Sequence, residues 1–318
     1  MNRREFLVTA LALQRILGQR ILSDAPRYRI GYTTNTRGLD PATTWATDPF
    51  RGFTEAHDVG FHYVEAFATA LSQFYPGDAP GLKKRIGEIG VQFAAITGGS
   101  RGGNTHFEDP AARQAVIENH LGVVRFSKPF GCDHQKTNLG ARRPEGTTQE
   151  DLKNIAETLE ILGRRSLQEE GIPFGVHAHL GSQLQNENEI DFIMANTDPQ
   201  HVRFVLDTGH ITMAGMDPLA LAKRLGHRVV EFHLKDTRPE DRGGARHVPD
   251  RDADQLKNPY FFPLGNGGVD FLSLKAYLDS IQWKGFLVVE LDTSPWRTPR
   301  ESARISAAYI RNTLQIAL

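Results

Sequence analysis

The amino-acid sequence predicts a single domain folded as a (β/α)8 TIM barrel, and three observations lead to this prediction. Eight short apolar segments recur between residues 29 and 291, each is followed by a helix-capable stretch, and no ninth segment follows. Strands that alternate with helices form parallel βαβ units, and eight units fit a closed barrel better than an open doubly wound sheet. With 318 residues, 39% of them hydrophobic, the chain is long and apolar enough for one such domain.

The predicted strands are runs of β-branched, aromatic and aliphatic residues. They are residues 29–32, 62–66, 92–96, 122–126, 173–178, 203–206, 229–234 and 286–291. Long polar connections at residues 98–108, 128–146 and 238–268 follow the third, fourth and seventh of these strands. They therefore fall on the carboxyl-terminal face of the barrel, where long loops usually carry function.

The starts of the helices support the same register. Four pairs place a capping side chain before proline at the first helical position: Asp48-Pro49, Asp109-Pro110, Asp217-Pro218 and Thr298-Pro299. Thr147 and Glu150 predict a capping box at the start of the longest helix, which we expect to extend to about residue 170.

The first 25 residues are treated apart from the barrel, which we assign to residues 26–318. Arg3 and Arg4 precede a short apolar run, as in a twin-arginine export signal, and a basic amphipathic leader is the alternative. The first interpretation predicts a periplasmic protein and the second a cytoplasmic one.

Composition excludes several classes of partner and site. The net charge of −1 provides no basic surface for nucleic acid or an anionic membrane. No apolar run approaches 18 residues, so stable membrane insertion is not expected. Cys132 is the only cysteine, which rules out an internal disulfide and a cysteine-based metal site. A homo-oligomer stays open.

Polar side chains follow the apolar part of four consecutive predicted strands. His177, Asp207, His233 and Glu290 supply imidazole, carboxylate, imidazole and carboxylate in that order. Each alone has a simpler explanation, such as a buried histidine or an ion-paired glutamate. Together on one rim, they predict a site for one divalent ion, with Mn²⁺ expected and Zn²⁺, Co²⁺ or Mg²⁺ as alternatives.

Further candidates lie beside these four residues. His179 is two residues after His177 and Lys235 two after His233, so each shares a strand face with its neighbour, and His210 follows the turn after Asp207. The candidate catalytic residues are Glu290, His179, His210, Lys235 and Glu65, and the candidate substrate-binding residues are His179, His210, Lys235 and the aromatic Trp45.

These motifs resemble a known family. Val-Leu-Asp207-Thr-Gly-His210, Phe-His233-Leu-Lys235-Asp, Pro-Leu-Gly-Asn-Gly-Gly-Val-Asp270-Phe and Val-Val-Glu290 are similar to the sugar phosphate isomerase/epimerase family, with its xylose isomerase-like barrel. The His-x-His-Leu-Gly-Ser stretch that begins at His177 resembles the inosose dehydratase branch. The resemblance covers about residues 28–315 and implies a metal held by His177, Asp207, His233 and Glu290.

The family implies proton abstraction next to the carbonyl of a keto sugar or keto-cyclitol, through a metal-stabilised enediolate. Reprotonation gives isomerisation or epimerisation. The alternative is a dehydratase or lyase, either inosose dehydratase-like or a β-elimination from a 3-keto-glycoside. Many epimerases of the family have glutamate, as ligand and acid–base group, where this chain has His177. A metal-bound imidazole cannot shuttle that proton, so elimination becomes more attractive.

Two other classes remain as alternatives. An abasic-site endonuclease of similar fold needs a basic DNA-binding face, which the net charge does not supply. A non-catalytic sugar-binding subunit would bind a keto sugar, cyclitol or glycoside without proton exchange at the carbon beside the carbonyl.

Overall fold

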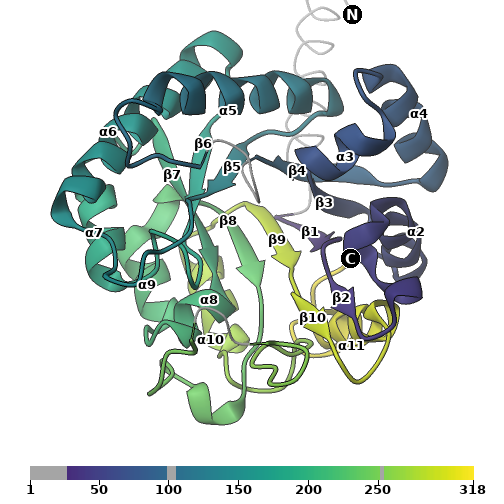
Figure 1. Cartoon of the computed structure of the whole chain (residues 1–318). Coiled ribbons are helices and arrows are strands. Elements are labelled where there is room, and N and C mark those ends of the chain that lie inside the picture. The colour runs from purple at the N-terminus through teal and green to yellow at the C-terminus, as the bar shows by residue number, and fades with distance from the viewer. Residues whose placement is uncertain (1–26, 99–104, 251–253) are drawn as a thin grey trace, which may run out of the picture.

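The computed structural model describes residues 27–98, 105–250 and 254–318, so the leader predicted for residues 1–25 lies outside the described part of the chain. Eight parallel strands form one sheet in the order β4-β3-β1-β9-β8-β7-β6-β5, and helices surround it (Figure 1). The strands are β1 (Tyr28–Thr33), β3 (Tyr63–Phe67), β4 (Gln92–Thr97), β5 (Gln135–Asn138), β6 (Phe174–His177), β7 (Val202–Asp207), β8 (Val229–Leu234) and β9 (Gly285–Val289).

The two outer strands of this order meet and close the barrel. Gly98, directly after β4, forms a parallel bridge with Thr137 of β5, and its N–H donates to the Lys136 carbonyl at 3.3 Å. The Gln135 side chain also donates to the Ile96 carbonyl at 2.5 Å. The predicted TIM barrel is confirmed.

Ten α-helices lie within the described residues, most of them on the outside of the barrel. They are α2 (Pro49–Val59), α3 (Ala68–Phe74), α4 (Ala79–Ile89), α5 (Arg113–Ser127), α6 (Gln149–Arg165), α7 (Glu187–Ala195), α8 (Thr208–Met213), α9 (Pro218–Leu225), α10 (Phe271–Ser280) and α11 (Pro299–Asn312). A π-helical segment, Ser166–Glu170, extends α6 as far as the sequence predicted. None of the helices in the described residues is long and apolar enough to cross a membrane.

One predicted strand was wrong. Residues 122–126 belong to the end of α5, whose buried residues Ile117, Leu121 and Val124 recur at helical spacing. The fourth barrel strand is instead β5, inside the predicted loop at residues 128–146. Its sequence, Gln-Lys-Thr-Asn, is polar, because its buried side chains are paired with other polar groups, such as Lys136 with Glu65 and Glu231. A strand of this kind contains no apolar run and is therefore not predicted from one.

Most of the predicted helix starts are confirmed. Asp48, Asp217 and Thr298 cap α2, α9 and α11, each with proline in the first turn. The capping box of α6 is formed by Thr148 and Asp151, one residue later than predicted. Asp109 accepts from the Ala111 N–H in a turn that precedes α5, rather than capping the helix itself.

A small second sheet lies beside the barrel. Strand β2 (Arg37–Gly38) pairs in parallel with β10 (Thr293–Ser294), which follows β9. The Arg37 N–H also donates to the Asp292 carbonyl at 2.9 Å. This pairing holds the connections after β1 and β9 side by side on the carboxyl-terminal face (Figure 1).

The barrel interior contains a buried ionic layer. Lys136 Nζ of β5 lies 2.6 Å from Glu65 Oε2 of β3 and 2.5 Å from Glu231 Oε1 of β8, with all three side chains almost fully buried. His134 Nε2 contacts the other Glu231 oxygen at 2.6 Å. A smaller apolar cluster that contains Phe286 lies next to this layer, since the His134 and Phe286 rings are 6.0 Å apart. The two carboxylates are tolerated inside the barrel because cations accompany them.

We expect Lys136→Met to lower the free energy of unfolding by about 3–5 kcal/mol, because removal of one partner leaves buried charge uncompensated. Urea denaturation of wild type and variant measures this difference. Lys84→Met is the matched control, since the Lys84 side chain is 80% exposed and should change stability little. Equal stability of the Lys136 and Lys84 variants would show that the buried lysine does not balance Glu65 and Glu231.

His134 should make stability depend on pH. Burial alone would lower the pKa of His134, but the adjacent Glu231 and Asp133 carboxylates raise it from 6.5 to about 9. The charged ring therefore stabilises the folded state fully below pH 6.5, and this contribution is lost as the pH rises toward about 9. Urea denaturation across that range should show a decline that is shallower in His134→Gln. Parallel pH profiles for the two proteins would refute the assignment.

Candidate active site

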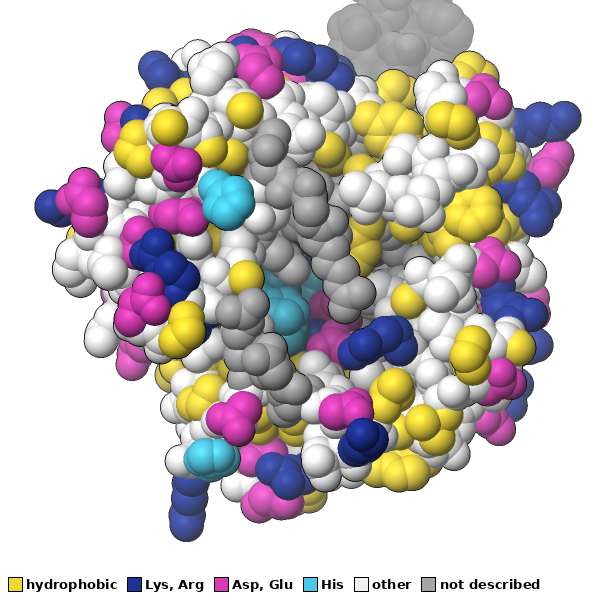
Figure 2. All heavy atoms as spheres, viewed as in Figure 1, with side chains coloured by type: hydrophobic (Ala, Val, Ile, Leu, Met, Phe, Trp, Pro, Cys, Tyr) yellow, Lys and Arg dark blue, Asp and Glu magenta, His cyan; other side chains and the backbone are white. Residues whose placement is uncertain are grey.

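Four of the predicted residues meet at the carboxyl ends of neighbouring strands. His177 ends β6, Asp207 ends β7, His233 is the penultimate residue of β8, and Glu290 directly follows β9. One ligand atom from each of the four buried side chains lies within 4.8 Å of the other three. Histidine and acidic side chains are visible inside a hollow near the centre of this face (Figure 2).

The facing atoms of these residues have unsatisfied hydrogen-bonding capacity. Asp207 Oδ2 lies 3.6 Å from both His177 Nε2 and His233 Nδ1, and His233 Nδ1 contacts Glu290 Oε2. Within the described chain, these four buried atoms meet no regular hydrogen-bond geometry, and the two carboxylate oxygens are also ion-paired with Lys235 Nζ at 3.1 Å and 3.5 Å. Two nitrogen and two oxygen donors that converge in this way fit a divalent metal ion.

The protonation states of three of these residues also suit a metal ion. Burial lowers the pKa of His177 to about 4, so its imidazole is neutral at pH 7. Burial alone would raise the pKa values of Asp207 and Glu290, but Lys235 lowers both, so the two carboxyls are ionised. Neutral imidazole and ionised carboxylate are the forms that bind a divalent cation.

Asp207 has two separate roles at the start of α8. Its Oδ1 accepts the His210 N–H at 2.8 Å and caps the helix, while its Oδ2 faces the other candidate ligands. Gly209 is required for the close approach of Lys235, because a Cβ atom there would lie 2.6 Å from Lys235 Cγ. Thr208 Oγ1 donates to the Lys235 carbonyl at 2.8 Å. The Asp-Thr-Gly-His motif therefore joins the ends of β7 and β8.

Lys235 is a fixed cation at the edge of the four-residue cluster. Its fully buried Nζ lies 3.1 Å from Asp207 Oδ2, 3.0 Å from Asp292 Oδ1 and 2.9 Å from His210 Nε2. Burial would lower its pKa, but Asp207 and Asp292 raise it, so the ammonium persists at neutral pH. It can stabilise negative charge that develops on a substrate.

Two histidines lie beside this ammonium group. The rings of His179 and His210 have centroids 3.7 Å apart. His179 Nδ1 lies 2.6 Å from the Leu180 carbonyl, which only accepts, so the proton is on Nδ1 and the lone pair of the neutral ring is on Nε2. Burial, followed by His179 and Lys235, lowers the pKa of His210 well below its usual value. The neutral His210 ring can accept a hydrogen bond from the Lys235 ammonium group through Nε2.

Two further clusters of possible ligands already contain a lysine. Lys235 Nζ contacts two members of the group His179, His210 and Asp292, and Lys136 Nζ contacts all of Glu65, Glu231 and His233. An ammonium group in either position competes with a metal ion. Lys235 Nζ also lies 3.1 Å from Asp207 Oδ2 and 3.5 Å from Glu290 Oε2. The set of His177, Asp207, His233 and Glu290 is nevertheless the best suited to an ion among the groups found in the described residues, because both ring nitrogens of His177 are buried without a hydrogen-bond partner.

The structure brings most of the predicted site residues together, with two exceptions. Glu65 binds Lys136 and lies 3.2 Å from His233 Nε2, so it supports a candidate ligand from within the barrel. Trp45 was expected to bind substrate, but it is fully buried in the main hydrophobic core against Tyr32. Its Nε1 donates to Glu55 at 2.7 Å. Its ring has no exposed face for a sugar.

Sequence analysis missed three residues that shape the site: Lys136, Glu231 and Asp292. Lys136 was missed because its strand was taken for a loop. A signal existed for the other two, because Glu231 is two residues before His233 and Asp292 two after Glu290. In an extended chain, residues two apart point to the same side, so Glu231 should lie on the side of His233 and Asp292 on the side of Glu290.

Comparisons with known proteins agree with this architecture. The xylose isomerase-like TIM barrel family matches residues 53–313. Inosose dehydratase from Salmonella typhimurium is 32% identical over 255 residues, which cover 78% of this chain and 84% of that protein.

Two solved structures show the same fold. A sugar phosphate isomerase/epimerase from Parabacteroides distasonis superposes with a TM-score of 0.68 at 17% identity, over 92% of this chain and 97% of that one. The IOLI protein, solved with a bound zinc atom, has a TM-score of 0.66 at 14% identity, over 91% of this chain and 99% of that one.

The resemblance predicted from the motifs is confirmed, and the relatives identify an enzyme of the sugar isomerase, epimerase and lyase type. The chain belongs to the xylose isomerase-like TIM barrel family.

Proposed function

We propose that this protein is a divalent-metal-dependent carbon–oxygen lyase that acts on a keto sugar or keto-cyclitol. The observation that carries the proposal is the convergence of buried donor atoms from His177, Asp207, His233 and Glu290, with an imidazole base alongside at His179. The similarity to inosose dehydratase at 32% identity supports an elimination reaction.

The four donor residues would hold one ion, and Mn²⁺ is the metal we expect for two imidazoles and two carboxylates. When bound, a divalent ion supplies Lewis acidity toward the substrate carbonyl and an adjacent oxygen. Glu290 is then occupied as a ligand, and Glu65 is held by Lys136. Neither carboxylate is our candidate for the base.

His179 is the proposed base. Its Nε2 lone pair takes the proton from the carbon beside the carbonyl, and the electron pair of that C–H bond passes toward the carbonyl oxygen. Lys235 stabilises the negative charge that develops there. The electron pair then forms a C=C bond as the β-oxygen leaves, and the His179 imidazolium returns its proton to that oxygen. The neutral ring is restored, and water or an alcohol departs.

Isomerisation or epimerisation is the second candidate, since it begins with the same proton abstraction. An epimerase that works with two carboxylates needs a second acid–base group on the far face of the substrate. His177 is neutral and belongs to the proposed ligand set, so it cannot take that role. This difference favours elimination over epimerisation.

Metal binding tests the ligand assignment. The chelator-treated wild-type protein should bind one Mn²⁺ per chain, measured by isothermal titration calorimetry. Asp207→Asn and His177→Gln should each weaken binding by more than about a hundredfold, because they remove a direct ligand. His201→Gln is the control, since His201 is paired with Glu160 outside the cluster. Wild-type affinity in the Asp207 and His177 variants would exclude this site.

Proton exchange tests the reaction. NMR of a keto-cyclitol or keto sugar in D₂O, with Mg²⁺ or Zn²⁺ as a diamagnetic ion, should show an elimination product. His179→Gln should lower kcat by about 10²–10⁴-fold. Its Mn²⁺ affinity should be unchanged, because His179 is outside the ligand set.

The same spectra separate the alternatives. A deuterated epimer or isomer in place of an unsaturated product would establish the second candidate. Bound metal with no exchange at all in a panel of keto sugars would indicate a binding protein. Full activity of His179→Gln would remove His179 from its proposed role.

A further inference from the structure

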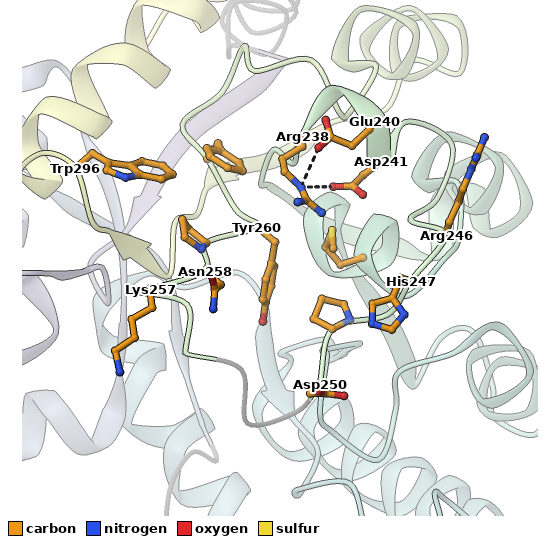
Figure 3. Close-up of a pocket in the computed structure, with 14 residues that line it drawn as sticks. Arg238, Glu240, Asp241, Arg246, His247, Asp250, Lys257, Asn258, Tyr260 and Trp296 are labelled. Carbon is orange, nitrogen blue, oxygen red and sulfur yellow. Dashed lines mark hydrogen bonds and ion pairs between the residues drawn. The ribbon is translucent and has the colours of Figure 1, made fainter.

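A cavity of about 830 Å³ lies on the same face as the candidate active site (Figure 3). Most of its wall comes from the connection between β8 and α10, and the rest includes Met213 at the end of α8 and Trp296 after β10. This volume is within the range of small-molecule binding sites. The proposed chemistry at the four-residue cluster does not use this cavity.

Aromatic side chains form one side of the cavity. The Trp296 and Phe262 rings are stacked, with centroids 5.5 Å apart and an interplanar angle of 17°. Trp296 is 60% exposed, whereas the other two tryptophans, Trp45 and Trp283, are 0% and 2% exposed. A tryptophan supported on one face and open to solvent on the other is suited to stacking on a flat ligand. The C–H bonds on a sugar ring meet the negative face of such a π-system favourably.

One extended segment links the cavity to the active site. Tyr260 and Phe262 line the cavity, and the ring of Phe261 between them contacts the Tyr260 ring, with centroids 4.7 Å apart. The Phe261 ring lies 4.9 Å from the His210 ring, and Lys235 Nζ lies 4.7 Å from its centroid. A ligand with one ring near His210 and Lys235 can therefore place a second ring in the cavity by crossing this segment.

The charges around the cavity favour a neutral, polyhydroxylated ligand. Cationic and anionic side chains balance there, since the lining includes Arg238, Arg246 and Lys257 and also Glu240, Asp241 and Asp250. Arg238 is directed at carboxylates, with Nε 3.2 Å from Asp241 and 3.5 Å from Glu240. A phosphate would meet these carboxylates as well as the cations. Sugar hydroxyls can use both, because they donate and accept hydrogen bonds.

We propose that this cavity binds the second ring of a glycoside, so that the substrate is a keto-glycoside with two rings rather than a free keto sugar. This inference rests on the proposed function. In the elimination, the β-oxygen that leaves would carry the second ring: a C–H and a C–O bond break, a C=C and an O–H bond form, and the second ring departs as an alcohol.

Binding can be measured without turnover, because Trp296 is the exposed tryptophan. Iodide quenching of tryptophan fluorescence should fall by at least about half when the unoxidised two-ring sugar maltose is added at saturation, since a stacked ring shields the indole. Methyl glucoside, which has one ring, should give much less protection. The measurement uses the full chain without added metal, so it is independent of the proposed reaction.

Kinetics test the same contact. Trp296→Ala should lower kcat/KM for 3-keto-maltose by about tenfold, through the lost stacking. The value for methyl 3-keto-glucoside should change by less than about twofold. Ile305→Ala is the control, because Ile305 is 42% exposed on α11 and does not line the cavity. It should change neither value.

The outcomes separate the two proposals. Protection of Trp296 by maltose without turnover of any keto sugar would support the subsite and refute the proposed reaction. Two outcomes would refute the subsite but not the reaction. In the first, Trp296→Ala lowers kcat/KM equally for 3-keto-maltose and methyl 3-keto-glucoside. In the second, the enzyme turns over but maltose does not protect Trp296 from iodide quenching. A change from dimer to monomer in Trp296→Ala, with no ligand effect, would instead assign this face to a second copy of the chain. A second copy is the main alternative occupant, because Leu39, which follows β2 beside β10, is an apolar side chain that is 65% exposed.

Discussion

The balance of charge inside the barrel determines where a cation can bind. Lys136 and Lys235 are both buried and both lie among carboxylates. Each ammonium group neutralises one cluster, and an ionic cluster in this environment persists only when its charges are paired. Four buried donor atoms converge beside the two lysines, on His177, Asp207, His233 and Glu290. Lys235 also lowers the pKa values of Asp207 and Glu290, so fold stability and metal chemistry depend on one arrangement of charge.

In the proposed reaction, Asp207, Lys235 and His179 have different roles. Asp207 caps α8 with one oxygen and faces the candidate ligands with the other, so the ligand is held by the helix that it starts. Lys235 reaches the site because Gly209 leaves room for its side chain. His179 keeps its proton toward the Leu180 carbonyl and its lone pair away from it. A neutral base, a fixed cation and a ligand set are the components that a one-base elimination requires.

Sequence patterns predicted the barrel and most of the polar residues at the carboxyl ends of its strands. Fully buried parallel strands are apolar runs, so β7 and β8 were recognised, and the polar residues at their ends followed directly. The same rule failed for β5, where the interior is ionic and Lys136 pairs with residues distant in sequence, on β3 and β8. Such pairing is visible only in three dimensions. The apolar run at residues 122–126 belongs to α5, because helical and strand burial cannot be distinguished over so few residues.

The location of the ion is the central claim, and anomalous diffraction from crystals of the full chain grown with Mn²⁺ tests it most directly. We predict one anomalous peak within about 2.0–2.3 Å of donor atoms on His177, Asp207, His233 and Glu290. The Lys235 and Lys136 ammonium groups should remain beside it. A peak among His179, His210 and Asp292, with Lys235 displaced, would contradict this account, as would a four-residue cluster without an ion at saturating Mn²⁺.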